Sequence, residues 1–194
     1  MRSSLLLASH SPRRRELLTA AGYEFEIASP QVDEKLYVDL TLRELTALNA
    51  IRKGLAVARA YPENIVVAAD TLIAFDHKII GKPRDLDEAK KILQRLSGQT
   101  HEVCSAVFVC HLARARSTSF DEISRVRFHR LSKQKIDNYL TETDPLDKAG
   151  AYAAQAAGSE IIERIDGSFT NVVGLPMEKT GRVLRDFGVN PRRA

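Results

Sequence analysis

The chain has 194 residues, of which 44% are hydrophobic and 28% are charged, and its formal net charge is +4. This composition is typical of a globular protein, and the length suffices for one hydrophobic core, so we expect a single domain over residues 1–194. No apolar run approaches the roughly 20 residues of a membrane-spanning helix. The positive charge favours an anionic partner but does not distinguish a nucleotide from a nucleic acid.

The two cysteines bear on the cellular compartment. Cys104 and Cys110 lie in one strand-like run, roughly 20 Å apart along an extended chain, so they cannot form a disulfide with each other. The N-terminal apolar run is also shorter than that of a signal peptide. Both features predict a protein of the cytoplasm.

The first part of the chain alternates strands and helices. We expect a buried strand, a helix ended by Gly22, a second strand, a long helix with Thr41 and Glu44 as capping box, and a strand that stops at Asp70. In chain order these segments are Leu5–Ala8, Pro12–Ala21, Glu24–Ala28, Thr41–Ala60 and Ile65–Ala69. The apolar stripe of the long helix contains Leu42, Leu45, Leu48, Ile51, Leu55 and Ala58.

The second part of the chain combines paired strands with helices. Asp76 and His77 separate two apolar segments, which predicts a hairpin of Leu72–Phe75 with Lys78–Ile80. The other expected segments are helices at Asp87–Leu96, Ser132–Leu140 and Pro176–Phe187, and strands at His101–His111, Ser117–Phe128, Ile161–Ile165 and Phe169–Val173. Together the two parts predict an α/β fold with a mixed, twisted sheet and flanking helices.

The segment after the first strand is typical of an anion site. Ser11 fits a helix N-cap and Pro12 the first helical position, which leaves free N–H groups and the positive end of a helix dipole at a strand's carboxyl end. Phosphate oxygens bind well there. Arg13, Arg14 and Arg15 cannot all face one ligand, since successive helical residues lie about 100° apart. An ordinary capped helix with solvated arginines explains the segment equally well.

Asp70 is the strongest candidate for a catalytic or metal-binding residue. It follows five apolar residues, where partial burial and nearby cations could tune it as a general base or make it a metal ligand. Thr71 and Lys82 also follow predicted strand ends, the edge at which α/β sheets bind ligands. The alternative interpretation is an aspartate that caps a turn with its own carboxylate.

Five sequence blocks carry a resemblance to a known family. In order they are S-H-S-P-R-R-R-E-L-L, A-A-D-T, I-I-G-K-P-R-D-L-D-E-A, D-P-L-D-K-A-G-A-Y-A-A-Q and V-V-G-L-P. Along nearly its whole length the chain resembles the Maf family of nucleoside triphosphate pyrophosphatases. The resemblance implies a Maf/ITPase-like fold of two lobes around a central cleft. It also implies a cytoplasmic enzyme that hydrolyses a nucleoside triphosphate to the monophosphate and pyrophosphate with a divalent cation, Mg²⁺, Mn²⁺ or Co²⁺.

The same resemblance implies catalytic and phosphate-binding roles. Asp70 matches the family's catalytic acid, the proton acceptor for water that attacks the α-phosphorus, and with Glu34 it would hold the metal. Arg14, Lys53 and Lys82 match basic positions that would hold the phosphates.

Base selection is implied at three further positions. Arg13, Thr71 and Gln155 look like the branch that acts on dTTP and UTP, whereas the branch that acts on 7-methyl-GTP carries other residues there. This chain departs from the family in having Ala156 and Ala157 after Gln155, where a glycine is usual, and alanine lacks the backbone freedom of glycine.

Two other functions stay open on the sequence. One is a pyrophosphatase for modified nucleotides, either modified pyrimidines or 7-methyl-GTP. The other is a non-catalytic nucleic-acid-binding regulator, which the absence of tryptophan and the scattered tyrosines and phenylalanines disfavour. We therefore expect a nucleoside triphosphate as partner and neither a membrane nor a nucleic acid, and a homodimer is compatible with the sequence.

Overall fold

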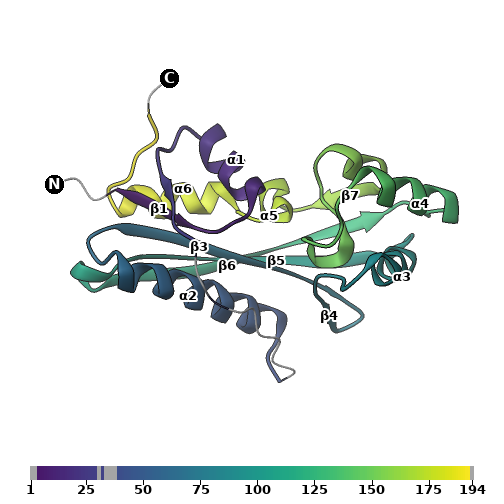
Figure 1. Ribbon diagram of the computed structural model, residues 1–194, viewed down its shortest axis with the longest axis horizontal. Coiled ribbons are helices and arrows are strands. Elements are labelled where there is room, and N and C mark those ends of the chain that lie inside the picture. Colours follow the sequence, from purple (N-terminus) through teal and green to yellow (C-terminus); the bar gives the residue numbers. More distant parts are fainter. Residues whose placement is uncertain (1–3, 30–31, 33–38, 193–194) are drawn as a thin grey trace. The chain divides into compact units, whose positions relative to one another are not determined.

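The computed structural model describes residues 4–29, 32 and 39–192, with Ala156 and Ala157 described by their backbone alone. Its strands form one mixed sheet in the order β2-β1-β3-β5-β6-β7, and β4 pairs with β3 (Figure 1). The strands are β1 (Leu5–Ala8), β2 (Glu26–Ile27), β3 (Ile65–Phe75), β4 (Lys78–Ile80), β5 (Thr100–His111), β6 (Arg116–Phe128) and β7 (Ile162–Asp166). The mixed α/β fold predicted from the sequence is confirmed.

The predicted helices are present in the predicted order, and α5 is an additional one. The α-helices are α1 (Pro12–Ala20), α2 (Leu42–Ala60), α3 (Leu86–Leu96), α4 (Lys133–Glu142), α5 (Phe169–Val173) and α6 (Met177–Asp186), and short 3₁₀ helices are η1 (Leu112–Arg114), η2 (Ala149–Ala151) and η3 (Ala156–Glu160). Thr41 and Glu44 cap α2 reciprocally as predicted, and the hydrogen bond from Thr41 lowers the pKa of Glu44. Within the described ranges, no helix has the length and hydropathy needed to span a membrane.

The chain divides into two compact units, which we describe separately. Unit 1 comprises Met1–Asp70, Ser105–Glu122 and Gly174–Ala194, and unit 2 comprises Thr71–Cys104 and Ile123–Val173. Strands β3, β5 and β6 therefore contribute residues to both units. The single domain with a central cleft that the sequence predicted stays a prediction.

In unit 1, helices cover both faces of parallel strands. Strand β1 runs parallel to β2 and β3, with α1 and α6 on one face and α2 on the other (Figure 1). Alternate strand residues enter two separate cores: Leu7 and Val67 pack with α1 and α6, whereas Val66 and Ala68 pack with α2. Because side chains alternate along a strand, Asp70, two residues after Ala68, also points toward α2.

Small residues bring α2 close to the sheet. Ala50, Gly54 and Ala58 are among its buried residues. A Cβ atom on Gly54 would lie 2.4 Å from Cδ1 of Phe108 and 3.2 Å from Cβ of Ala68, too close for a side chain without movement of its neighbours. The absence of a side chain at Gly54 therefore sets the distance between α2 and the strands beneath it.

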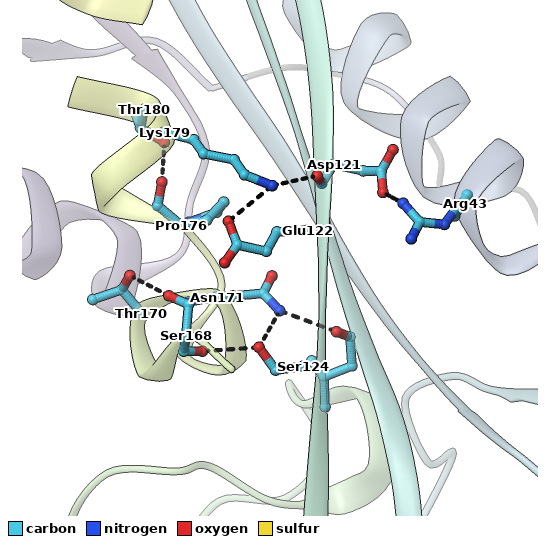
Figure 2. A network of polar contacts seen from close by, with 11 residues as sticks. Arg43, Asp121, Glu122, Ser124, Ser168, Thr170, Asn171, Pro176, Lys179 and Thr180 are labelled. Atoms are coloured by element: carbon cyan, nitrogen blue, oxygen red, sulfur yellow. Dashed lines mark hydrogen bonds and ion pairs between the residues drawn. The ribbon is translucent and has the colours of Figure 1, made fainter. Parts of the chain in front are cut away.

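Unit 2 has its own core and a buried polar network. The side chains of His101, Phe128 and Tyr152 pack edge to face, and the Tyr152 hydroxyl lies 2.7 Å from Nε2 of His101. Nδ2 of Asn171 donates to Ser124 Oγ (2.9 Å) and to the carbonyl oxygen of Val103 (3.1 Å), which ties α5 to β5 and β6 (Figure 2).

Strand β6 also carries two acids that bind helices within unit 1. Lys179 of α6 forms an ion pair with Glu122 (3.3 Å) and donates to the carbonyl oxygen of Asp121 (3.3 Å), while the Asp121 carboxylate pairs with Arg43 of α2 (Figure 2). Adjacent residues of the strand thus anchor helices from its two faces.

Most predicted segments are confirmed within a few residues, but two were wrong. The predicted strand end at Asp70 does not exist, because β3 continues unbroken to Phe75 and pairs there with β4. The predicted strand at Phe169–Val173 is the helix α5. Its first turn is capped, since the Ser168 hydroxyl accepts a hydrogen bond from the backbone N–H of Asn171 at 3.2 Å.

The predicted apolar stripe of α2 was also only partly right. Leu45 and Ala58 are buried as expected, but Leu42, Leu48, Ile51 and Leu55 are half-buried. The fully buried face instead includes the polar residues Thr46, Asn49 and Lys53. Thr46 bonds to its own helix at the Leu42 carbonyl oxygen, whereas the burial of Asn49 and Lys53 against the sheet indicates a role beyond packing.

Candidate active site around Asp70

Asp70 is buried in the middle of β3 and is held by two side chains from α2. The residue is 3% exposed, and the ammonium of Lys53 lies 2.6 Å from its Oδ1. Nδ2 of Asn49 donates to Oδ2 at 3.1 Å. Each carboxylate oxygen therefore has one donor from the same helix.

The helix period explains why both donors reach one carboxylate. Asn49 and Lys53 are four residues apart and so lie on one face of α2, one turn above the other. Since Gly54 lets α2 approach the sheet closely, that face meets the side of β3 from which Asp70 projects. A buried carboxylate needs a counterion, because burying a charge alone is costly. Lys53 supplies that charge.

The contacts leave Asp70 with acceptor capacity. An ionised carboxylate has about four acceptor positions. The bonds to Lys53 and Asn49 take one on each oxygen. The group can therefore accept a proton or a further hydrogen bond without losing its two supports.

Asn49 has an unusual feature on its other side. Its Oδ1 is buried and has no hydrogen-bond partner among the described residues. A buried polar atom without a partner costs about 1–3 kcal/mol. Reversing the amide would place Oδ1 against the Asp70 carboxylate, which is repulsive, so the electrostatics fix Nδ2 toward Asp70. Asn49 was not among the predicted site residues, although a polar residue one turn before Lys53 in a helix against a buried strand was the available signal.

The predicted anion segment begins beside Asp70. Ala8 of β1 is in register with Ala68 of β3. Asp70 lies two residues further along β3, so the segment that leaves the sheet at Ser9 starts next to the site. Ser11 is the N-cap of α1 and Pro12 its first residue, as predicted, but the Ser11 side chain makes no cap hydrogen bond.

Arg14 is tied into the fold at this segment. It is buried, its Nη1 donates to Ser9 Oγ at 3.2 Å, and its Nε donates to the carbonyl oxygen of Gly174 at 2.9 Å. Ser9 Oγ also accepts the backbone N–H of Ser11 at 3.2 Å. Arg13, one position earlier, is half-buried. The structure thus brings Arg14 to the strand end and gives it an architectural task that the sequence did not predict.

Three predicted site residues belong to unit 2. Thr71 is half-buried and follows Asp70 in β3, Lys82 is exposed after β4, and Gln155 is the half-buried N-cap of η3. The N–H of Gly150 donates to the carbonyl oxygen of Gly81 at 3.1 Å, so the loop of Lys82 lies against the block that contains Gly150. The roles of all three residues stay predictions.

Few of the described side chains are placed to bind a metal ion. Glu34, one of the two predicted ligands, lies outside the described residues. In the described part of the chain, no group of three or more His, Cys, Asp or Glu side chains is placed to bind a metal ion. The Asp70 carboxylate, which has acceptor positions beyond its bonds to Lys53 and Asn49, is a hard oxygen donor of the kind that Mg²⁺ and Mn²⁺ prefer. Such an ion fits this site if substrate phosphates complete its coordination.

Comparison with known proteins finds similar chains and a matching family. A dTTP/UTP pyrophosphatase of Bacillus pumilus is 41% identical over 189 residues, 97% of this chain and 99% of the relative. One of Carboxydothermus hydrogenoformans is 41% identical over 184 residues, 95% and 98% of the two chains. The solved Ham1 protein of Staphylococcus aureus has a similar fold, with a TM-score of 0.51, 14% identity, and coverage of 98% of this chain and 93% of its own. The family model described as Maf-like protein matches residues 4–187, and the chain therefore belongs to the Maf-like family.

Proposed function

We propose that this protein is a nucleoside triphosphate pyrophosphatase that hydrolyses dTTP and UTP to the monophosphate and pyrophosphate. The full-length relatives that carry this name support the activity and the substrates. The observation that carries the proposal is the buried Asp70, supported by Lys53 and Asn49 beside the start of the Ser9 segment.

In this proposal Asp70 accepts the proton of the attacking water. A base must be fixed within hydrogen-bond distance of the water, and general-base catalysis of this kind contributes about 10²- to 10⁴-fold in rate. The contacts of Asp70 with Lys53 and Asn49 fix its direction and leave acceptor positions for a water. The water oxygen then attacks the α-phosphorus, the bond from the α-phosphorus to the bridging oxygen breaks, and pyrophosphate leaves.

Lys53 has a second task in the proposal. A carboxylate about 4 Å from one unit of phosphate charge is repelled by about 4 kcal/mol at an effective dielectric constant of about 20. The ammonium at 2.6 Å from Asp70 offsets this repulsion before the substrate arrives. Arg13, Arg14 and Lys82 are the further cations that we assign to the phosphates.

A divalent cation, Mg²⁺, Mn²⁺ or Co²⁺, is part of the proposal. Asp70 and Glu34 would hold it, and when bound it would neutralise phosphate charge and polarise the phosphoryl oxygens. The oxygen donors of the Asp70 carboxylate suit such a hard cation, which supports this assignment.

We assign base recognition to Arg13, Thr71 and Gln155. Side-chain amides and hydroxyls reject a wrong base edge because an unpaired buried polar group costs about 1–3 kcal/mol. Uracil and thymine present the same polar edge and differ by one methyl group. The same site would therefore accept both dTTP and UTP.

Pyrophosphate release from a nucleotide panel tests the proposal. Purified protein is incubated with dTTP, UTP, CTP, ATP, GTP, 7-methyl-GTP and a modified pyrimidine nucleotide, with and without each of the three cations. We expect cation-dependent release that is fastest from dTTP and UTP. A preference for 7-methyl-GTP or for the modified pyrimidine would contradict dTTP and UTP as the substrates. Salt-sensitive DNA binding without pyrophosphate release would contradict the enzymatic activity and favour a nucleic-acid-binding regulator.

A further inference from the structure

We propose that Asn49 is a positioning residue for Asp70, acting through its amide nitrogen. The inference rests on the proposed function and deepens it. It assigns to Asn49 the orientation of the proton acceptor, a task that neither the sequence analysis nor the comparisons give to any residue. Asn49 acts through Asp70 and touches no substrate in this proposal.

The geometry of the Asp70 carboxylate requires two donors to fix it. The torsion that rotates a carboxylate about its Cβ–Cγ bond is broad, so one contact does not fix its plane. Lys53 holds Oδ1 and Asn49 holds Oδ2, each from α2. Two donors on one rigid helix, one for each oxygen, fix both the plane of the carboxylate and the direction of its remaining lone pairs.

The oxygen of the same amide is unpaired, which makes an amide costly at this position. Asn49 is 3% exposed, and its Oδ1 has no hydrogen-bond partner among the described residues. A leucine has nearly the same size and shape, would avoid this unpaired atom, and would join a face of α2 that already includes Leu45, Ala50 and Val57. Packing alone therefore favours an apolar residue at this position. The donor directed at Asp70 is the feature that only the amide supplies.

The test separates positioning from a general effect on folding. We compare kcat, KM for dTTP and Tm of the wild-type protein, Asn49→Leu and Asn49→Asp. Thr46→Val is the matched control, because Thr46 is buried on the same face of α2 and bonds only to the Leu42 carbonyl oxygen one turn away in the hydrogen bonds described for it. Valine keeps its shape and removes that bond.

The expected result is a split between the kinetic constants. Asn49→Leu lowers kcat by about 10- to 100-fold, the size of effect that misplacing a reacting group by about 1 Å produces. KM for dTTP changes less than about twofold, and Tm stays within a few degrees of the wild type. Thr46→Val keeps the wild-type kcat. Asn49→Asp retains an oxygen on both sides but loses the donor, and it lowers kcat at least as far as Asn49→Leu.

Three results would overturn the inference. A wild-type kcat in Asn49→Leu shows that the amide does not position Asp70. A wild-type kcat in Asn49→Asp shows that the oxygen, and not the nitrogen, is the functional atom. An equal loss of kcat in Thr46→Val shows a general effect of disturbing α2. If Asn49→Leu does not fold, Asn49→Ala replaces it with the same expectations for kcat and KM. A wild-type protein that releases no pyrophosphate from any nucleotide instead overturns the proposed function, and the inference with it.

Discussion

Two buried asparagines, one beside the proposed site and one in a structural network, differ in how fully their polar atoms are bonded. In unit 2, Asn171 donates both amide hydrogens, to Ser124 and to the carbonyl oxygen of Val103, and its backbone N–H is bonded to Ser168. In unit 1, Asn49 donates to Asp70 and leaves its Oδ1 buried with no partner in the described part of the chain. The amide of Asn171 is therefore well hydrogen-bonded, whereas the amide of Asn49 has an unsatisfied acceptor.

The difference separates stability from function. A satisfied network fixes a unique packing and raises the free energy of unfolding. A polar group that is left partly unpaired lowers that free energy and is retained where the local chemistry requires it. We therefore expect substitutions at Asn171 to reduce stability and substitutions around Asp70 to reduce turnover.

The largest effect should come from Asp70→Asn. The variant keeps the shape of the side chain and removes the proton acceptor, so we expect kcat for dTTP to fall by about 10³-fold. It also removes the counterion of the buried Lys53, and breaking a buried pair costs about 3–5 kcal/mol of stability. Turnover is therefore measured at a temperature at which circular dichroism shows the variant to be folded. A kcat within tenfold of the wild type would contradict the assigned role.

Asn171→Ala should show the opposite pattern. It leaves a small cavity and removes the partners of Ser124 and Val103, so we expect the free energy of unfolding to fall by about 2–4 kcal/mol. The kcat of the folded protein should change less than about threefold. Urea unfolding measures the first and steady-state kinetics the second. Asn138→Ala, at an exposed position of α4, is the control and should change stability by less than about 0.5 kcal/mol.

The pH dependence of stability should expose a buried neutral group in unit 2. Burial lowers the pKa of His101 from 6.5 to about 4. The unfolded chain takes up a proton as the pH falls below about 6.5, whereas the folded chain does so only near pH 4, so stability is lost over that window. The loss attributable to His101 is up to about 3 kcal/mol.

Urea unfolding at several pH values between about 7 and 4.5 measures this loss. His101→Gln keeps a polar partner for the Tyr152 hydroxyl and does not titrate. The variant should therefore lose less stability than the wild type as the pH falls. Equal slopes for the two proteins would show that other groups cause the loss.

The smallest effect should come from Gly54→Ala, which should lower both the stability and the kcat. The new Cβ would lie 2.4 Å from the Phe108 ring, so α2 must move away from β3 at an expected cost of about 1–3 kcal/mol. The same movement draws Asn49 and Lys53 away from Asp70 and should lower kcat. Gly181→Ala in α6 is the matched control, because its nearest contact is the movable Tyr23 hydroxyl at 3.3 Å and alanine favours a helix. Wild-type turnover in Gly54→Ala would separate the close packing from the site.

Sequence reasoning succeeded where the determining interactions are local. The capping box of α2, the hairpin around Asp76 and His77 and the start of α1 at Pro12 all depend on residues within one turn or one hairpin. Asp70 was singled out by its place after a buried apolar run, and the family resemblance implied Lys53 as a phosphate-binding residue. The structure joins the two in an ion pair, and their roles stay predictions. Sequence reasoning failed at Phe169–Val173, where hydrophobic residues resemble a strand but the Ser168 cap starts a helix.

The amino-acid sequence by itself determined most of the order of the elements and the helix and strand periods, and it singled out Asp70 as the candidate acid. Only the tertiary structure decided that β3 continues through Asp70, that the buried face of α2 includes polar residues such as Asn49 and Lys53, and that Asn49 reaches Oδ2. It also joined Arg14 to Gly174, 160 positions away in the chain. The physical reason is the separation along the chain of the residues that interact. Periodicity and caps follow from bonds between near neighbours, whereas the partner of a buried side chain is chosen by strand register and by how closely a helix such as α2 can approach the sheet.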